Sequence, residues 1–127
     1  MEKRFIPLKE LEVYKLAREL SKLAWEIYKE LDWQDKKTMG DQFISAVDST
    51  GANIAEGYGR FHLLDRIKFY YNSRGSLLES NDHWIELLNE RGKVKPEMYK
   101  KFKTTAKELG IKLNNFINAT YKQKQKQ

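Results

Sequence analysis

The sequence contains no cysteine and only two prolines among its 127 residues. The lack of cysteine excludes a disulfide framework, a thiol nucleophile and a cysteine-ligated zinc site, and it fits a reducing compartment. No run of about 18 apolar residues occurs, which argues against a membrane-spanning helix. The first ten residues, MEKRFIPLKE, lack the apolar core of a secretory signal. These absences predict a cytoplasmic protein that is not bound to a membrane.

The residues that are present suit a soluble globular chain. Hydrophobic residues make up 40% and charged residues 33% of the sequence, a balance typical of a folded domain with a charged surface. The length predicts one domain. The formal net charge is +6, and much of the excess lies between Arg91 and Lys126. A basic balance of this kind favours nucleic acid or an acidic protein as a partner.

Apolar residues recur at steps of three and four, the period of an amphipathic helix. The pattern covers four segments of the chain, residues 9–31, 38–55, 63–89 and 96–121. DWQDKK (32–37) and ERGKVK (90–95) interrupt it and are predicted loops. Helices joined by short loops predict an all-α, antiparallel up-down four-helix bundle. We expect this single domain to cover residues 1–121 and a basic disordered tail to cover 122–127.

Several residues mark the expected helix ends. Thr38, followed three residues later by Asp41, resembles a capping box at the start of the second helix. Gly57 and Gly59 are predicted to end that helix, because glycine readily adopts the left-handed turn at a helix terminus. Pro96 suits the first turn of the last helix, where its fixed backbone angle costs nothing.

Small and polar residues are concentrated in STGANIAEGYGR (49–60). A glycine inside a helix lowers the stability of the helix by about 1 kcal/mol relative to alanine. We therefore expect Gly51 and Gly75 to serve a structural role that offsets this loss. Close packing of the second helix against the third is the simplest such role, and we expect these two glycines to face one another. That contact would gather four polar side chains into one hydrogen-bonded cluster, namely Asn53, Glu56, Ser76 and Glu79.

Three stretches of the sequence resemble one known family. These are ANIAEGYGR at 52–60, RGSLLE at 74–79 and LKELEVYKLARELSKLAWEIY at 8–28. Together they resemble the 23S rRNA-intervening sequence proteins, over nearly the whole chain. The first two stretches, about twenty residues apart, are specific as a pair.

The resemblance implies a bacterial up-down four-helix bundle that assembles as a ring, a homopentamer, and whose biochemical role is unsettled. It also implies a gene within an intervening sequence of ribosomal RNA. The accessory variability determinants of diversity-generating retroelements are similar in fold. Those proteins form a basic pentameric barrel that binds nucleic acid and a reverse transcriptase.

Candidate catalytic and metal-binding residues are few. His62 and His83 are the only histidines, and His62 is interpreted as a helix cap or surface residue. Glu79 and His83 are four apart and share a helix face, which gives at most a weak metal site. Glu56 and Glu79 could act as a general acid and base, but the interhelix cluster is the favoured interpretation. We therefore predict a non-enzymatic protein without a catalytic site, a cofactor or a metal.

Nucleic-acid binding through phosphates is the favoured function, and the alternative is a structural or adaptor protein that grips a partner such as a reverse transcriptase. Five aromatic residues lie near basic ones in the sequence, namely Tyr58, Phe61, Tyr70, Tyr71 and Tyr99. Bases could stack on any of them that are exposed, and most are expected to lie in the core. Trp33 is a candidate subunit contact. The predicted phosphate contacts are Arg60, Arg66, Lys68, Arg74, Lys100, Lys103 and Lys107. Against this, a run of charge along a helix is commonly just a solvated face.

Overall fold

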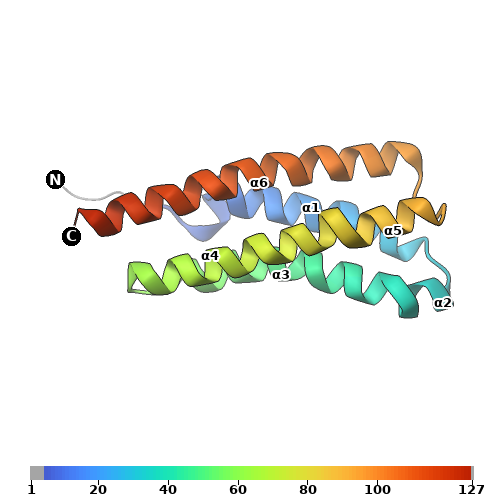
Figure 1. The fold of residues 1–127 in the computed structure, drawn as a ribbon, viewed down its shortest axis with the longest axis horizontal. Helices are drawn as coiled ribbons and strands as arrows, with labels where there is room; N and C mark the ends of the chain where they lie inside the picture. The colour runs from blue at the N-terminus through green and yellow to red at the C-terminus, as the bar shows by residue number, and fades with distance from the viewer. Residues whose placement is uncertain (1–4, 127) are drawn as a thin grey trace.

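The computed structural model describes residues 5–126. Within that range the chain forms helices and no strand, which confirms the predicted all-α bundle. Figure 1 shows four helical rods that run up and down along one long axis. No helix in the described part of the chain is long and apolar enough to cross a membrane.

Two of the rods are built from more than one element, and a short 3-10 turn precedes the first rod. The elements are η1 (Leu8–Glu10) and α1 (Glu12–Lys29), then α2 (Trp33–Asp35), η2 (Lys36–Gly40) and α3 (Asp41–Tyr58), then α4 (Leu63–Leu78), η3 (Glu79–Trp84) and α5 (Ile85–Glu90), and last α6 (Pro96–Gln125). The element η1 is a 3-10 turn, whereas η2 and η3 are π-helical segments inside otherwise continuous rods.

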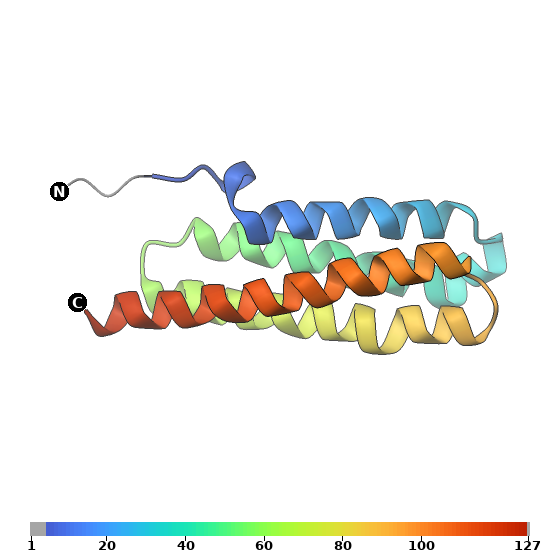
Figure 2. The same ribbon diagram turned by 90° about the horizontal axis from the view of Figure 1, so that it is seen from above.

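The rods pack in a closed cycle. In this cycle α1 contacts α3, α3 contacts α4, α4 contacts α6, and α6 contacts α1. The α1/α3 face and the α4/α6 face therefore lie on opposite sides of the bundle. The start of the described chain, the end of α6 and the α3–α4 turn lie at the same end, on the left in Figures 1 and 2.

The core follows the apolar periodicity of each rod. Phe43 of α3 and Phe102 of α6 meet with ring centroids 5.3 Å apart, and both side chains are fully buried. Tyr70 of α4 lies 4.8 Å from the ring of Phe116. Burial of large aromatic side chains contributes much of the hydrophobic stabilisation in a domain of this size.

The predicted contact between Gly51 and Gly75 is wrong. Gly51 is buried, but it faces α1, where a Cβ placed on it would lie 3.4 Å from the Cβ of Ala17. Gly75 is exposed and has nothing within 4 Å of the position of a Cβ. The two glycines therefore point to different sides of the α3–α4 pair and do not meet.

The close approach between α3 and α4 occurs instead at Gly57. A Cβ there would lie 2.7 Å from Cε1 of Tyr70 and 2.9 Å from the Cβ of Phe69. These distances are shorter than real side chains tolerate, so only glycine fits without a shift. The glycine that was predicted to end the helix is thus buried within it and serves the packing of α4.

A buried hydrogen bond fixes the register of the same pair. The hydroxyl of Ser73 on α4 donates to the backbone carbonyl oxygen of Thr50 on α3 at 2.7 Å, and both residues are fully buried. A buried hydroxyl requires such a partner. This bond between the two helices takes the place of the predicted polar cluster.

The start of the second rod lies earlier than predicted. The carboxylate of Asp32 accepts a hydrogen bond from the backbone N–H of Asp35 and caps α2. Thr38 lies within η2, where its hydroxyl donates to the carbonyl of Gln34 and caps nothing. The expected loop is therefore mostly helical. Trp33 is 72% exposed there, and its role as a subunit contact stays a prediction.

The helix ends also differ from expectation. Gly59 follows α3 with a right-handed φ of −78°, so no left-handed cap forms there. Gly92, with φ of +69°, makes the turn before α6. Pro96 begins α6 as predicted. The helix then continues to Gln125, past the expected end at Tyr121, because lysine and glutamine are good helix formers. The predicted tail is thus largely helical, and Gln127 lies outside the described residues.

The two glycines of the α3–α4 pair give a matched test of this packing. We expect Gly57→Ala to lower the free energy of unfolding by about 1–3 kcal/mol, because the new methyl group overpacks against Phe69 and Tyr70. Gly75→Ala should raise it by about 0.5–1 kcal/mol, because alanine is the better helix former at an open site. Urea unfolding followed by circular dichroism measures both values. Equal effects of the two substitutions would contradict the assigned contact.

Candidate nucleic-acid interface

The side chains of the predicted polar cluster are not brought together. The amide of Asn53 donates to the carbonyl of Ser49 on its own helix at 2.8 Å. The carboxylate of Glu56 pairs with Arg60 at 3.5 Å, also on its own rod. Ser76 is half-buried on α4, and no hydrogen bond joins it to Asn53 or Glu56 in the described part of the chain. Asn53 and Glu56 therefore have local roles within their own rod.

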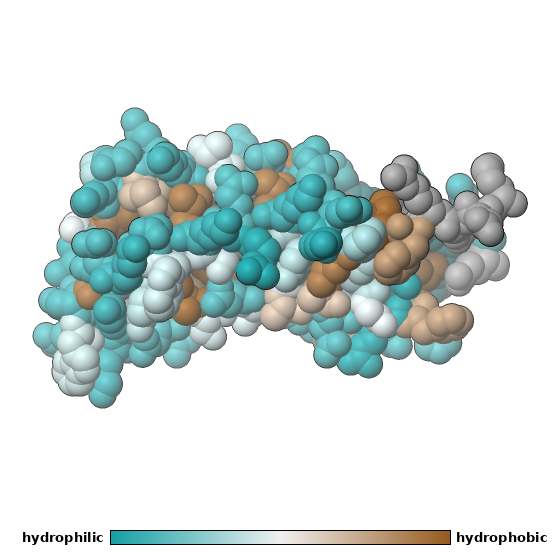
Figure 3. All heavy atoms as spheres, turned by 180° about the vertical axis from the view of Figure 1, so that it is seen from behind, coloured by the Kyte–Doolittle hydropathy of each residue, from teal (hydrophilic) through white to brown (hydrophobic). Residues whose placement is uncertain are grey.

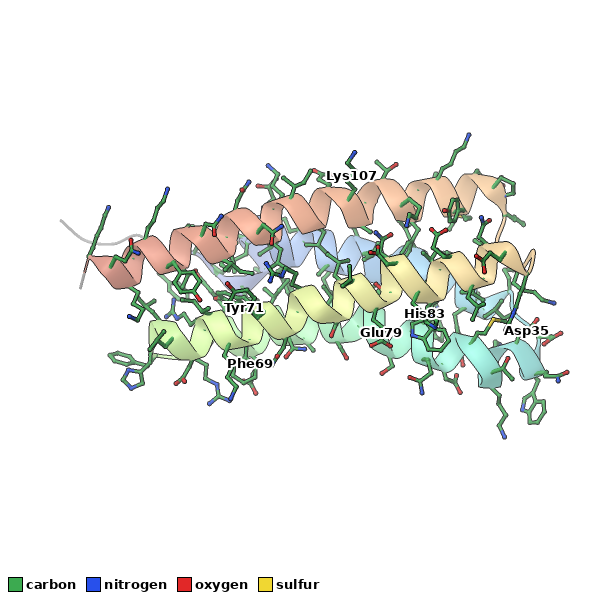
Figure 4. All side chains as sticks on the ribbon, in the orientation of Figure 1. Asp35, Phe69, Tyr71, Glu79, His83 and Lys107 are labelled. Carbon is green, nitrogen blue, oxygen red and sulfur yellow. The ribbon has the colours of Figure 1, made fainter. Side chains whose placement is uncertain are left out.

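Glu79 is likewise engaged locally. Its carboxylate accepts a hydrogen bond from the indole N–H of Trp84 at 2.7 Å, and Figure 4 shows Glu79 and His83 on the same rod. Glu56 and Glu79 are both exposed and bond to different partners, so they do not form an acid–base pair. Within residues 5–126, no group of three or more potential metal-ligating side chains occurs.

Three of the predicted phosphate contacts lie together at the end of the bundle that carries the α3–α4 turn. We call this region the terminal surface; it consists of Arg60, Phe61, Arg66, Lys68, Lys122, Lys124 and Lys126. The turn and the last turns of α6 lie at this same end (Figure 2). Six of these residues are cationic, and residues 59–68 and 121–126 contain one carboxylate, Asp65.

Aromatic rings hold the two arginines of the terminal surface in place. The guanidinium of Arg60 lies 4.8 Å from the ring centre of Phe69, and that of Arg66 lies 5.8 Å from the ring of Tyr58. Nε of Arg66 also donates to the carbonyl of Arg60 at 2.6 Å, which closes the turn. These cation–π contacts orient both side chains while leaving other N–H groups available.

Phe61 is the most exposed large apolar side chain in the described chain, at 88%. It lies in the α3–α4 turn between Arg60 and the start of α4 at Leu63. The ring of His62 contacts it edge-on at 5.2 Å, and His62 precedes α4 without forming a side-chain cap. An exposed ring in a turn that also carries Arg60, and that Arg66 follows in the first turn of α4, has the composition of a base-stacking platform.

Arg74 and Lys107 form a second basic location, on the α4/α6 face. They line a hollow of about 620 Å³ together with Tyr71 and Asn114, and Figure 4 shows Tyr71 between the two rods. The guanidinium of Arg74 lies 4.6 Å from the ring centre of Tyr71 and donates to Asn114 at 3.1 Å. Arg60, Phe61 and Arg66 of the terminal surface do not line this hollow.

Lys100 and Lys103 lie on the first turns of α6, toward the opposite end. Lys103 is held by the carboxylate of Glu86 at 2.9 Å and by the carbonyl of Asn81 at 2.8 Å. Hydrogen bonds from Tyr99 and Lys103 lower the pKa of the Glu86 carboxyl. Lys103 is therefore a structural cation, whereas Lys100 is exposed. The seven predicted contacts thus fall into three places and do not form one surface.

The lysines of the last turn of α6 were not predicted as contacts. Lys122 and Lys124 lie on a continuous helix that ends beside the α3–α4 turn. One feature of the sequence could have predicted their position: no glycine or proline occurs between Tyr121 and Lys126, and this favours continuation of the helix.

Comparison with known proteins supports the fold. The family model described as 23S rRNA-intervening sequence protein matches residues 9–115. A crystal structure of a protein of unknown function from the S23 ribosomal protein family of Bacteroides thetaiotaomicron VPI-5482 is similar, with a TM-score of 0.76 and 24% identity. The alignment covers 83% of this chain and 97% of that one. No curated protein matches the chain.

The bonds that Glu86 accepts from Tyr99 and Lys103 make the free energy of unfolding depend on pH in the acid range. Because the folded-state pKa of Glu86 lies below the ordinary 4.5, the ionised carboxylate stabilises the fold above that value, and the contribution is lost as pH falls through the folded pKa. We expect the stability deficit of Glu86→Gln relative to the wild type to shrink between about pH 7 and about pH 3. Thermal unfolding across pH measures it, with Glu90→Gln as the exposed control. A deficit that stays constant would contradict the assigned ion pair.

Proposed function

The chain belongs to the 23S rRNA-intervening sequence protein family, and we propose that it is a non-enzymatic, self-associating bundle that binds single-stranded RNA or DNA at its terminal surface. The observation that supports this most strongly is Phe61. A phenylalanine with 88% of its surface exposed loses hydrophobic stabilisation in the free protein. Stacking on an unpaired base would recover it, and the flanking cations would neutralise the adjacent phosphates.

The two arginines are suited to phosphate binding because their side chains are already oriented. Arg66 is fixed by its bond to the Arg60 carbonyl and by the ring of Tyr58. Arg60 lies over Phe69 and pairs with Glu56 at 3.5 Å across an exposed surface. An exposed pair of this kind contributes little stability, so a phosphate can replace the carboxylate at small cost.

A duplex fits this surface less well than a single strand. The stacking ring projects from a short turn, and a duplex keeps its bases stacked on one another, out of reach of Phe61. Helix α6 and the residue after it supply Lys122, Lys124 and Lys126 to the terminal surface. Lysines of this kind contact phosphates and do not distinguish one base from another. The proposal is therefore a preference for unpaired strands, with little dependence on base identity.

Self-association and a non-enzymatic role complete the proposal. The separated carboxylates of Glu56 and Glu79 support a binding role over catalysis. The family resemblance supports a ring of copies, such as a pentamer, in which each copy presents one terminal surface. Several weak sites on one assembly bind a long strand far more tightly than one site does. The alternative, an adaptor that grips a reverse transcriptase or another protein, is an outcome of the test below.

The test is fluorescence anisotropy with a labelled unstructured RNA and a matched duplex, in about 50–200 mM salt. We expect the single strand to bind more tightly, with an affinity that falls steeply as salt rises. Phe61→Ala should weaken binding by about 5–150-fold, the range that stacking of one base supports. Arg66→Gln should reduce the salt slope by about 0.7, one phosphate contact to a single strand.

The matched control is Lys100→Gln, which removes the same charge from the opposite end of the bundle. It should leave both affinity and salt slope nearly unchanged. Equal losses from Lys100→Gln and Arg66→Gln would show general attraction by net charge and would contradict a defined site. No binding in low salt would refute nucleic-acid binding and favour the adaptor role.

A further inference from the structure

The hollow between α4 and α6 brings together groups that the bundle itself does not use. Its volume of about 620 Å³ is in the range of small-molecule sites, and we call it the α4/α6 hollow. The stretch RGSLLE (74–79) supplies four of its lining residues, which are Arg74, Gly75, Leu77 and Leu78. Helix α6 supplies the facing side, with Ala106, Lys107, Gly110 and Asn114.

Two glycines inside helices line the hollow, and the packing of their own bundle requires neither. A Cβ on Gly75 would have no atom within 4 Å, and a Cβ on Gly110 would lie 3.8 Å from Cδ2 of Leu77, an ordinary contact. Glycine is a poorer helix former than alanine, so both positions lower helix stability without a gain in packing. What they provide is room for an outside group to approach two helix backbones.

Each of the two helices also contributes one cation to the lining, Arg74 from α4 and Lys107 from α6. Within residues 5–126, neither cation forms an ion pair with a carboxylate. Asp82 is the one carboxylate in the lining, so two cations against one carboxylate leave a single positive charge. The ring of Tyr71 and the amide of Asn114 orient Arg74, whose fork of N–H groups suits a carboxylate.

An unsatisfied polar atom accompanies these cations. Oδ1 of Asn81, another lining residue, is the one buried side-chain nitrogen or oxygen in the described part of the chain that has no hydrogen-bond partner. The amide nitrogen of Asn81 donates to Asp82 at 3.3 Å. An unpaired buried acceptor lowers stability, and an N–H group of a ligand would satisfy it once the amide turns into the hollow. Both residues belong to η3, and π-helical turns are frequent at functional sites.

The hollow between α1 and α3, on the opposite face, lacks these features. Figure 3 shows the molecule from behind, where most of the surface is hydrophilic and the apolar residues form separate patches. The charged residues that line this hollow of about 370 Å³ are Arg18 and Asp48. Arg18 donates to the hydroxyl of Tyr14 at 3.1 Å, and Asp48 accepts from Ser21 at 2.7 Å. Its polar groups therefore already have partners.

We infer that the α4/α6 hollow binds an organic carboxylate that has an apolar body and an N–H donor. N-acylated amino acids and the C-termini of apolar peptides have this chemistry. The carboxylate bonds to Arg74 and Lys107, the N–H group donates to Asn81 or Asp82, and the apolar body contacts the leucines of the lining. One net positive charge matches a monoanion better than a phosphate dianion. The inference does not rest on the proposed function, because no residue of the terminal surface lines the hollow.

Isothermal titration calorimetry with N-acetyl-leucine tests the site, with no nucleic acid present. The matched probe is N-acetyl-leucinamide, which differs only in lacking the negative charge. We expect the carboxylate to bind at millimolar concentration or below, and the amide to bind at least about 10-fold more weakly, the effect of a hydrogen bond to a charged group. A short peptide that ends in leucine distinguishes the two sources. Tighter binding than N-acetyl-leucine indicates a peptide C-terminus, and equal binding indicates a free small molecule.

Variants of the lining and a matched control locate the site. Arg74→Gln and Lys107→Gln should each weaken binding of N-acetyl-leucine by about 10-fold or more. Lys101→Gln removes the same charge from an exposed position on α6 outside the lining and should leave the affinity unchanged. Gly75→Leu should abolish binding by filling the hollow. The open space around Gly75 allows the fold to persist, which circular dichroism checks.

Three results would overturn the inference. They are no binding of N-acetyl-leucine by the wild type, equal affinities for the carboxylate and the amide, and equal losses from Lys101→Gln and Arg74→Gln. All the variants keep Arg60, Phe61 and Arg66, so failure here does not decide nucleic-acid binding at the terminal surface. Failure of the RNA titration likewise leaves the result for the α4/α6 hollow unchanged.

Discussion

The contact of α3 with α4 at Gly57 is the constraint on which the candidate site depends. Without a side chain at this position, Phe69 and Tyr70 lie directly against the backbone of α3. The buried bond from Ser73 to Thr50 then fixes the two helices along their length. Since a close approach and a buried hydrogen bond each tolerate little displacement, the α3–α4 turn is held in one position.

That position arranges the chemistry of the terminal surface. Phe69, placed by its contact with Gly57, is the ring over which Arg60 lies, and Tyr58 at the end of α3 is the ring for Arg66. The two arginines and the exposed Phe61 are thus oriented by packing that continues into the core. A site supported in this way loses less side-chain entropy on binding than one made of free lysines.

The distribution of charge separates structural cations from available ones. Lys103 is held by Glu86, and Lys93 by Asp35 at 3.0 Å, whose carboxylate raises the pKa of the lysine. Both pairs lie toward the end opposite the terminal surface. The net charge of +6 is therefore a poor guide to a binding site by itself, since part of it balances carboxylates within the bundle. Near Phe61, Arg60 pairs with Glu56 only across an exposed surface at 3.5 Å, and such a pair is weak.

The fold followed from apolar periodicity, but contacts between helices did not. The sequence does not tell which neighbour Gly51, Gly57 or Gly75 faces, because the rotation of each helix in the bundle decides it. The sequence pattern does not identify Asp32 as a helix N-cap, because residues 32–37 interrupt the apolar periodicity and are predicted as a loop. Lys103 is indistinguishable from Lys100 until Glu86 is placed beside it. Charge could be read residue by residue, whereas the exposure of Gly75 and the pairing of side chains across helices depend on tertiary packing.

The most direct test of the account is an NMR titration of the labelled protein with an unstructured oligonucleotide. Chemical-shift changes should be concentrated in the α3–α4 turn, around Arg60, Phe61 and Arg66, and in the last turn of α6. Changes centred on Lys100 and Lys107, or spread evenly over the lysines of the chain, would contradict it.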